Sequence, residues 1–587
     1  MTGPWARSAR AARNRWVRML APPLAHLVGS VALTSSVWSH PGTELVGAGS
    51  NPSAKVWFLA FFAHGLATGH LQLLTHLTTA PHTINLMWNN SILAISLLLA
   101  PITLTLGPVV AYNVAMTVGL AASGWVAGLA LRRYVRHPAS AWAGGAIFGF
   151  SPFILAEADS GHLLWVTLWP IPVLLLLLDS LVRTRRPPAW LLGIGMGVWI
   201  GLEMLTSEEL VTTCALVSAG TLLALAATHR HAARALLPRV AVALAVALPV
   251  ALVIAGAPLA VQFLGPHRLV MGVVEPPAVN VADLFAVVMP TELQAAAPPF
   301  LVAITQHFTG YPFDRVVYLG VPLLVFLGWV VFAGRRDPRV RLFAALAAAV
   351  TVLALGSHLH VDGRATGIPL PWSVFARLPL VSKALPSRLM AVTWLAVATL
   401  VALGIDRLAE RPGGAARARS AVLVGAVALS LVPAGGELTS GAVVPAFFRT
   451  ALVHRVAAGG TLLTTPIPNA DGCTGLLWQA ASGFAYTTPT GCLLHAGTRP
   501  GLIVSYAGST PLRTDLWRTQ AGTPVAVTPR TRPALLAQLR VWRVRAVAVG
   551  PGPGEAVTRS FLSALLQQRP DRVHGVWLFT VSAAAAP

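Results

Sequence analysis

The chain has 587 residues, of which 55% are hydrophobic and 11% are charged, and its mean hydropathy is +0.68. No soluble globular domain of ordinary composition combines these values, so the chain is predicted to be a polytopic membrane protein. The net charge of +22 does not indicate nucleic-acid binding, because the arginines stand in short clusters beside apolar runs, as in cytoplasmic loops. Three cysteines exclude a dense disulfide framework and a four-cysteine metal site.

The first apolar run follows a basic segment, ends near Trp38, and is predicted to be the first membrane helix. A cleaved signal peptide would begin in the same way, but no clear small-x-small cleavage site follows the run. We therefore expect an uncleaved helix with a cytoplasmic N-terminus.

The next apolar segment, residues 92–106, decides the topology. It contains Pro101 and has about 15 residues, whereas a span needs about 20. If the segment crosses the membrane, the basic segment RRYVRH at 132–137 lies outside. If it is re-entrant or interfacial, residues 108–131 form the second span and RRYVRH is cytoplasmic. We prefer the second option, because every later basic cluster then also lies inside.

About eleven transmembrane helices are predicted for a membrane domain over residues 1–438, with a large first outer loop at 39–108. After the first two, they lie near 139–156, 164–182, 189–206, 209–227, 240–261, 315–333, 342–356, 389–406 and 420–437. The cytoplasmic segments hold 22 basic residues and the longer outside loops before the C-terminal region hold seven, which supports this orientation.

An odd number of spans places residues 439–587 on the extracytoplasmic side, where a small soluble α/β domain is predicted. The runs GTLLTTPIP, RVRAVAVGP and GVWLFTVS are typical of strands, while PALLAQLRVW and VTRSFLSALLQQ have helical spacing. Cys473 and Cys492 lie in this domain, and a disulfide between them would close a loop of about twenty residues worth about 3 kcal/mol. Two separate thiols are the alternative.

Polar groups gather on the predicted outer face. Those in the first outer loop include Glu44, Asn51, Lys55, His64 and Trp88. Further acids and bases follow in AEADSGHLLW, in the short turn TSEEL and in the loops 262–314 and 357–388; they include Glu157, Asp159, His162, Glu208, Glu209, Arg364 and Arg388.

Acids at outer span ends that face scattered cations suit transfer chemistry on a lipid-linked phosphate. A carboxylate can take the proton of an attacking hydroxyl, and a cation can hold the phosphate of the leaving group. Each acid singly could instead be a solvated helix end or cap. Glu208 and Glu209 are harder to explain in that way, because almost no loop joins the spans beside them.

Two other patterns in the first outer loop have simpler explanations. Its histidines are spaced too widely for one helical metal face, and no HExxH motif occurs, so no metal site is predicted. Residues 53–70 carry an aromatic and aliphatic stripe that predicts a helix lying in the membrane interface.

Several stretches between residues 40 and 215 form a familiar series: GAGSNP, VWFLAFFAHGL, INLMW, LLLAPITLTLGPVVAYNV, FGFSPF, GHL and TSEELVTT. In these stretches the chain resembles integral-membrane glycosyltransferases of the GT-C class, and a bacterial branch of GT-C-like proteins in particular. LLWQAASGFAYTTPTG in the C-terminal region is similar to the same branch.

The resemblance implies a polyprenyl-phosphate-linked sugar donor, transfer on the extracytoplasmic face, and an acid in the first outer loop as the base. Here the loop acid of that pattern falls on Asn51, which cannot accept a proton as a carboxylate does. Either Glu44, Asp159 or Glu208 serves as the base, or the chain keeps only the scaffold. Carrying function over from fold and short motifs is analogy.

The sequence therefore favours a GT-C-like glycosyltransferase of the bacterial inner membrane, acting in cell-envelope glycan or glycolipid assembly. Its expected partners are the lipid bilayer, a polyprenyl-phosphate-linked sugar donor and a glycan, lipid or protein acceptor, and a divalent metal ion is left open as a cofactor. Two alternatives are a non-catalytic scaffold that binds lipid-linked substrate or envelope partners, and a transporter or flippase. The expected catalytic residues are Glu208, Asp159, Glu44 and Asn51, and the expected substrate and phosphate ligands are Lys55, His64, His162, Trp88, Arg364 and Arg388.

Overall fold

The computed structural model describes residues 4–184, 186–269, 280–310, 317–378, 381, 384–410, 414–434, 438–458, 460–468, 472–496, 503–504 and 510–581. The chain divides into two compact units. The first unit contains Met1–Ser36, Ala115–Ile254 and Glu275–Leu438, and the second contains Val37–Val114, Ala255–Val274 and Thr439–Pro587.

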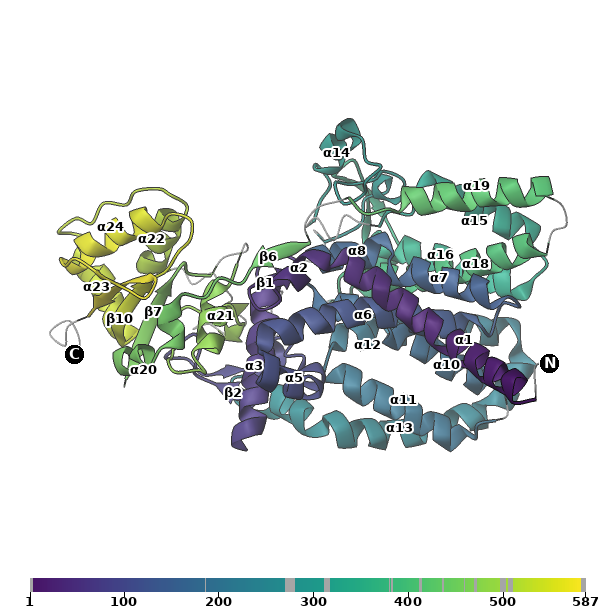
Figure 1. The fold of residues 1–587 in the computed structure, drawn as a ribbon, viewed down its shortest axis with the longest axis horizontal. Coiled ribbons are helices and arrows are strands. Elements are labelled where there is room, and N and C mark those ends of the chain that lie inside the picture. Colours follow the sequence, from purple (N-terminus) through teal and green to yellow (C-terminus); the bar gives the residue numbers. More distant parts are fainter. Residues whose placement is uncertain are drawn as a thin grey trace. The chain divides into compact units, whose positions relative to one another are not determined.

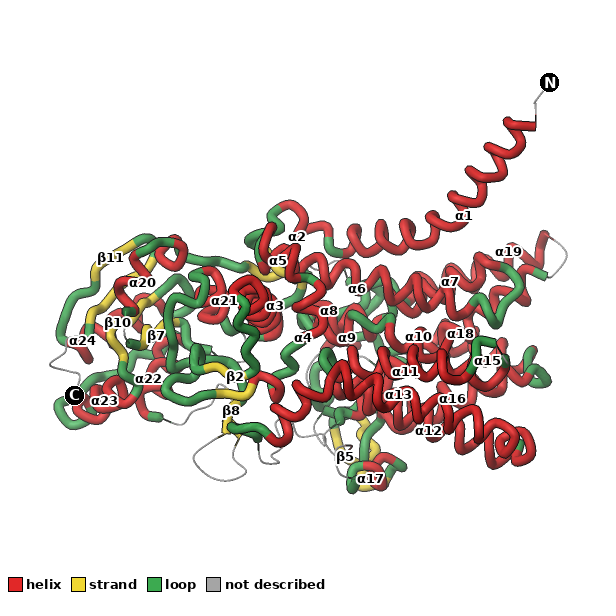
Figure 2. The backbone as a smooth tube through the Cα atoms, turned by 90° about the horizontal axis from the view of Figure 1, so that it is seen from below, coloured by secondary structure: helices red, strands yellow, loops and turns green. Residues whose placement is uncertain are grey.

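The first unit is built mainly of helices (Figures 1 and 2). Three of them, α2, α6 and α13, also extend into the second unit. The helices are α1 (Pro4–Leu33), α2 (Ser35–Ser39), α6 (Pro108–Leu131), α7 (Pro138–Gly149), α8 (Pro152–Asp159), α9 (Leu163–Val166), α10 (Pro170–Arg183), α11 (Ala189–Met204), α12 (Glu208–Thr228), α13 (Arg230–Leu264), α14 (Pro299–Thr305), α15 (Val321–Ala333), α16 (Pro338–Ala354), α17 (Trp372–Phe375), α18 (Met390–Ala409) and α19 (Gly414–Ser430). The first unit also contains the short helices η2 (Phe285–Val287) and η4 (Pro386–Leu389) and a hairpin of β4 (His358–Val361) and β5 (Arg364–Pro369).

Several of these helices have the length and composition of membrane spans. Among the described residues five qualify: Pro108–Leu131, Pro138–Asp159, Glu208–Thr228, Arg230–Leu264 and Pro386–Ala409. Met19–Leu33, Ala189–Met204 and Val321–Ala333 are shorter apolar helices. Each of the eleven predicted span ranges contains a helix, and the number of helices that cross the membrane stays a prediction.

Helix α18 forms the centre of the first unit. Almost all of its residues are buried, and it packs against α7, α15 and α16. Small residues allow another close contact, between α11 and α13: a Cβ added at Gly193 or Gly197 would lie 2.5 Å from the carbonyl oxygen of Ala243 or Ala247. Glycines at this spacing let membrane helices approach backbone to backbone.

The second unit contains a layered α/β structure in its C-terminal part. A four-stranded sheet has the order β11 (Asp571–Val573), β12 (Val576–Thr580), β10 (Val544–Val549) and β7 (Thr461–Thr465). The pair β7 and β10 is parallel, with Val547 opposite Leu463, and the other pairs are antiparallel. The remaining elements of this part are β6 (Thr439–Gly441), η5 (Ala446–Arg449), α20 (Leu452–Ala457), α21 (Thr474–Ala481), β8 (His495–Ala496), β9 (Ile503–Val504), α22 (Pro511–Gln520), α23 (Arg532–Val541) and α24 (Glu555–Leu566).

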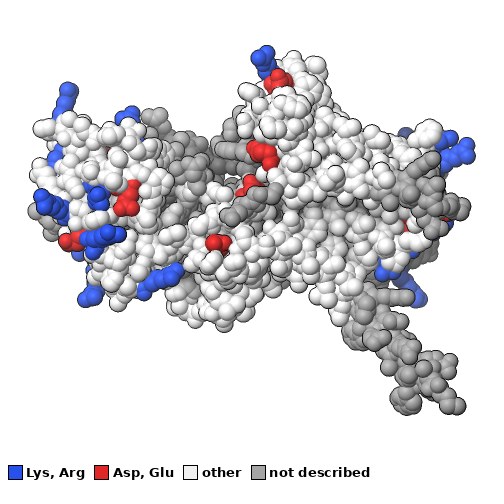
Figure 3. Space-filling view, turned by 45° about the horizontal axis from the view of Figure 1, so that its top comes forward, with Lys and Arg blue, Asp and Glu red and all other residues white. Residues whose placement is uncertain are grey.

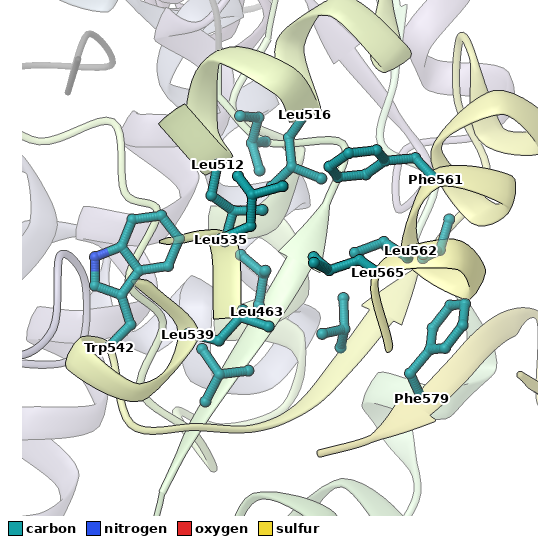
Figure 4. Packing of buried hydrophobic residues seen from close by; sticks show 14 residues of the cluster. Leu463, Leu512, Leu516, Leu535, Leu539, Trp542, Phe561, Leu562, Leu565 and Phe579 are labelled. Carbon is teal, nitrogen blue, oxygen red and sulfur yellow. The ribbon is translucent and has the colours of Figure 1, made fainter. Parts of the chain in front are cut away.

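Helices α22, α23 and α24 pack on the sheet through one apolar cluster (Figure 4). Leu463 and Phe579 from the strands meet Leu516, Leu539 and Phe561 from the helices in it. The three strands and two helices predicted from the sequence of this region are therefore confirmed. Arginines are numerous on the surface of this part, whereas the visible surface of the first unit is mainly uncharged (Figure 3).

The first predicted outer loop also belongs to the second unit. It forms β1 (Glu44–Val46), α3 (Asn51–Thr68), β2 (Leu74–Thr75), β3 (Ile84–Asn85), η1 (Leu86–Trp88), α4 (Leu93–Leu98) and α5 (Ala100–Leu106). Pro101 stands at the start of α5, so the short apolar segment at 92–106 is broken into two helices. Strand β1 pairs antiparallel with β6, which joins this loop to the residues that follow the last predicted span.

Helix α3 differs from the predicted interfacial helix. Its stripe residues Trp57, Phe61 and Phe62 are at most 8% exposed, because α3 packs against α4, α5 and α21. An apolar stripe has the same spacing whether it faces lipid or protein, so the sequence pattern could not separate the two.

Candidate functional site

A buried arginine organises the polar residues of the first unit. Arg388 Nη1 donates a hydrogen bond to Glu209 Oε2 at 2.5 Å, and the arginine side chain is 11% exposed. The guanidinium carbon lies 5.1 Å from the centre of the Trp165 ring. The backbone N–H of Leu385 donates to Glu209 Oε1 at 3.1 Å. We call Glu209, Arg388 and Trp165 the arginine cluster.

Local sequence explains how these side chains are presented. Ser207 caps α12 by accepting a hydrogen bond from the N–H of Leu210 at 3.3 Å, so Glu208 and Glu209 stand in the first turn. Acids are favoured there by the helix dipole. On the other side, Pro386 starts the short helix η4 that carries Arg388. The cluster thus joins the starts of two apolar helices to α9.

A second acid–base pair lies in the turn between α8 and α9. Glu157 and His162 are 1% and 8% exposed, and Nδ1 of His162 lies 2.5 Å from Glu157 Oε2. The N–H of His162 also donates to the carbonyl of Glu157 at 2.8 Å, through a turn in which Gly161 adopts a positive φ of 66°. His162 precedes the first residue of α9, so this pair lies at the start of the helix that carries Trp165 of the arginine cluster.

Asp159 ends α8, between Glu157 and His162, and is half-buried. Among the described residues it makes no ion pair and no side-chain hydrogen bond. The carboxylate of Glu292 repels that of Asp159 electrostatically. Asp159 therefore offers a carboxylate that no basic side chain in the described part of the unit neutralises.

Of the predicted residues in the first unit, Arg388 belongs to the arginine cluster, and Asp159 and His162 lie in the turn that leads into the helix carrying Trp165. Glu208 starts α12 beside Glu209, yet the ion pair to Arg388 is made by Glu209. Arg364 lies exposed on β5 and, within the described ranges, forms no ion pair.

Three residues of the site were not among the predicted site residues: Glu209, Glu157 and Trp165. All three lie in segments that the sequence analysis singled out: Glu209 in the turn TSEEL, and Glu157 and Trp165 in AEADSGHLLW. No local signal pairs Glu209 with Arg388, which stands 179 positions later.

The other predicted residues lie in the second unit. Glu44 is half-buried on β1, and its Oε1 lies 3.5 Å from Nδ1 of His40. Asn51 is the first residue of α3, and His64 lies exposed on the same helix with its ring 5.6 Å from that of Phe484.

Lys55 and Trp88 are bound to backbone carbonyls of the second unit. The Lys55 side chain is buried, and its ammonium donates to the carbonyl of Asn90 at 2.7 Å. Trp88 Nε1 donates to the carbonyl of Gln262 at 2.9 Å. Both side chains thereby hold loops of this unit in place.

Cys473 and Cys492 form a disulfide, with their Cα atoms 6.1 Å apart. The bond closes the loop that contains α21. Across the described ranges, no group of three or more His, Cys, Asp or Glu side chains is arranged to hold a metal ion.

The first unit thus has apolar helices with an acid and arginine cluster at their ends, and the first outer loop contains an apolar segment that is broken into α4 and α5. No family model matches the chain, and no curated protein matches it. The fold is similar to that of the arabinofuranosyltransferase AftD from mycobacteria, a GT-C enzyme, with a TM-score of 0.57 and 15% identity. The match covers 97% of this chain and 40% of AftD, so the chain spans less than half the length of that protein.

Two other solved structures show weaker similarity. The oligosaccharyltransferase of Archaeoglobus fulgidus matches with a TM-score of 0.49 and 13% identity, over 90% of this chain and 69% of its own. ArnT from Cupriavidus metallidurans, bound to undecaprenyl phosphate, matches with a TM-score of 0.43 and 12% identity, over 95% and 98%.

Proposed function

We propose that the chain is a membrane glycosyltransferase that transfers a sugar from a polyprenyl-phosphate donor on the extracytoplasmic face, in cell-envelope glycan or glycolipid assembly. The observation that carries this proposal is the arginine cluster at the ends of apolar helices in a GT-C-like fold, with the unneutralised carboxylate of Asp159 in the turn before the helix that carries Trp165. We place the protein in the bacterial inner membrane, with its N-terminus in the cytoplasm and residues 439–587 outside.

The proposed chemistry assigns one role to each group. The oxygen of an acceptor hydroxyl attacks the anomeric carbon of the donor sugar while its proton passes to the Asp159 carboxylate. The bond from the anomeric carbon to the phosphate oxygen breaks, and its electron pair leaves with the polyprenyl phosphate. Arg388 holds that phosphate, because a guanidinium has five N–H donors and can bind Glu209 and a phosphate together.

Glu209 and Trp165 fix the guanidinium before the donor arrives, through the ion pair and the ring contact. Such preorganisation lets a cation stabilise the charge that develops on the leaving phosphate without reorganising during the reaction. The buried pair of Glu157 and His162 orders the turn that carries Asp159.

A second candidate is a non-catalytic GT-C-like scaffold that binds a lipid-linked substrate. Asn51 favours it, because an amide stands where the GT-C resemblance expects the loop acid. The burial of Lys55 also removes one cation that the sequence offered to a phosphate.

The test is turnover by the purified full chain in nanodiscs with a panel of polyprenyl-phosphate sugars. Wild type, Asp159→Asn, Glu208→Gln, Glu44→Gln and Asn51→Asp are compared. We expect wild type to release sugar from one donor and Asp159→Asn to lose about 10²–10⁴-fold of the rate, as for other general bases, while still binding the donor. Donor binding is read from the rise in apparent stability that a ligand for the native state produces.

Full activity of Asp159→Asn, with loss in Glu208→Gln or Glu44→Gln, would move the base to that residue. Donor binding without turnover in wild type, together with turnover in Asn51→Asp, would establish the scaffold. Neither binding nor turnover with any donor would reject both candidates in favour of a transporter or partner-binding protein.

A further inference from the structure

An open pocket lies in the first unit, outside the arginine cluster. It has a volume of about 580 Å³ and lies between the loop after η2, helix α14 and the residues after α19. Its wall is mostly alanine, proline and valine, including Val302, Ala303 and Ala434, and its polar groups are Glu292, Gln294 and Gln306. The volume falls within the range of small-molecule sites.

Two of the chain segments that line this pocket are paired with each other. The N–H of Ala295 donates to the carbonyl of Val432 at 3.0 Å, and the N–H of Ala434 donates to the carbonyl of Leu293 at 2.9 Å. The two chain segments therefore form a short antiparallel β-bridge. The buried Gln294 folds back on Thr291, accepting from its N–H at 2.8 Å and its hydroxyl at 3.0 Å.

The groups at the pocket edge are available to a ligand. Glu292 and Gln306 are exposed, and in the described part of the chain their side chains make no ion pair or hydrogen bond. A carboxylate accepts hydrogen bonds from hydroxyls, and a carboxamide both donates and accepts. The small apolar wall suits the C–H face of a sugar ring, and the negative charge of Glu292 disfavours an anionic ligand.

The pocket edge carries a charge that acts on the proposed base. The carboxylates of Glu292 and Asp159 repel each other electrostatically within the first unit. We propose that this pocket binds a neutral sugar residue of the acceptor glycan and presents its hydroxyl to Asp159. As an acceptor site it rests on the proposed function. It narrows the acceptor class from glycan, lipid or protein to an uncharged glycan.

The test measures binding of neutral and uronic-acid-containing oligosaccharides to the full chain in nanodiscs, without donor. Ala303→Trp fills the pocket from an exposed position on α14, and Glu292→Gln removes the carboxylate while keeping its shape. Ala296→Trp is the matched control, because Ala296 is exposed on the loop before α14 but does not line the pocket. Thermal unfolding of all variants confirms that each is folded.

We expect a neutral oligosaccharide to bind wild type and Ala296→Trp equally. Ala303→Trp should lose at least tenfold in affinity and Glu292→Gln should lose several-fold. With donor present, Ala303→Trp should still hydrolyse donor to free sugar while transfer to glycan falls. Equal binding by Ala303→Trp, preference for the uronic acids, or binding of no oligosaccharide would overturn the pocket assignment.

The two proposals fail separately. Donor turnover without glycan binding would retain the transferase and reject this pocket as its acceptor site. Glycan binding that Ala303→Trp abolishes, with no turnover of any donor, would retain a carbohydrate site and reject the transferase.

Discussion

At the scale of single residues, Arg388 is a buried cation whose charge is balanced by Glu209. Removing one partner of a buried pair leaves the other charge desolvated without compensation. We therefore predict that Glu209→Gln lowers the free energy of unfolding by about 3 kcal/mol. Chemical denaturation of the purified protein measures this change.

The matched control at this scale is Arg364→Ala, which removes an exposed arginine from the first unit. Its effect should stay within about 0.5 kcal/mol, as for ordinary surface substitutions. A double-mutant cycle with Glu209→Gln and Arg388→Met should give a coupling energy of about 1–3 kcal/mol. A coupling near zero would show that the two side chains do not stabilise each other.

The residues of the site were only partly predictable. Acids in a membrane protein stand out from an apolar background, so TSEEL and AEADSGHLLW could be recognised as special from composition alone. Choosing Glu209 over Glu208 needs the direction in which each side chain leaves the helix. Pairing with Arg388 needs the fold, because periodicity carries no information about contacts between residues 179 positions apart.

At the scale of elements, a hydrogen bond between buried side chains joins helices α3 and α21. Trp57 Nε1 donates to Gln479 Oε1 at 2.7 Å, and the amide of Gln479 donates in turn to the carbonyls of Leu77 and Tyr486. We predict that Trp57→Phe destabilises the protein by about 1–3 kcal/mol, because it keeps a ring but leaves the Gln479 oxygen unsatisfied. Trp190→Phe is the control, since Trp190 is 52% exposed. Equal thermal stability of the two variants would contradict this role for Trp57.

The disulfide between Cys473 and Cys492 closes a loop across a sequence separation of 19 residues. We predict that replacing both cysteines by alanine lowers the free energy of unfolding by about 3 kcal/mol. A cross-link that closes a loop of this size reduces the entropy of the unfolded chain by an amount that corresponds to this free energy. Non-reducing peptide mapping should find the two cysteines in one cross-linked peptide of the native protein. Finding both cysteines as free thiols would contradict the disulfide. Cys214→Ser, which replaces a buried free cysteine, is the control and should leave the cross-linked peptide unchanged.

Elements with a strong local pattern were predictable, and pairings between distant segments were not. Apolar runs marked the helices, and alternating or β-branched runs marked β7, β10 and β12, because these patterns follow from the period of each structure. The pairing of β1 with β6 was missed, since a strand of three residues is too short to show a period. The burial of α3 was missed because the pattern does not show which helices cover it, and one of them, α21, lies some four hundred residues away in sequence.

At the scale of the whole molecule, the predicted topology can be tested by labelling. In a Cys214→Ser background, single cysteines replace Arg132, Thr366 or Ala537, all at exposed positions. We predict that an impermeant maleimide labels Thr366→Cys and Ala537→Cys in intact spheroplasts, and Arg132→Cys only after permeabilisation, because basic segments stay in the cytoplasm. Labelling of Ala537→Cys only after permeabilisation would require an even number of crossings.

The pairing of β1 with β6 also sets an order of events during synthesis. Leu45 lies opposite Ser440, so one strand leaves the ribosome almost four hundred residues before its partner exists. At a translation rate of about 5–20 residues per second, the delay is roughly 20–80 s. Throughout that interval Trp57 and its aromatic neighbours have no α21 to cover them. A chain that ends before residue 474 therefore lacks the helix that covers Trp57 in the finished protein, so the aromatic face of α3 is buried only late in synthesis.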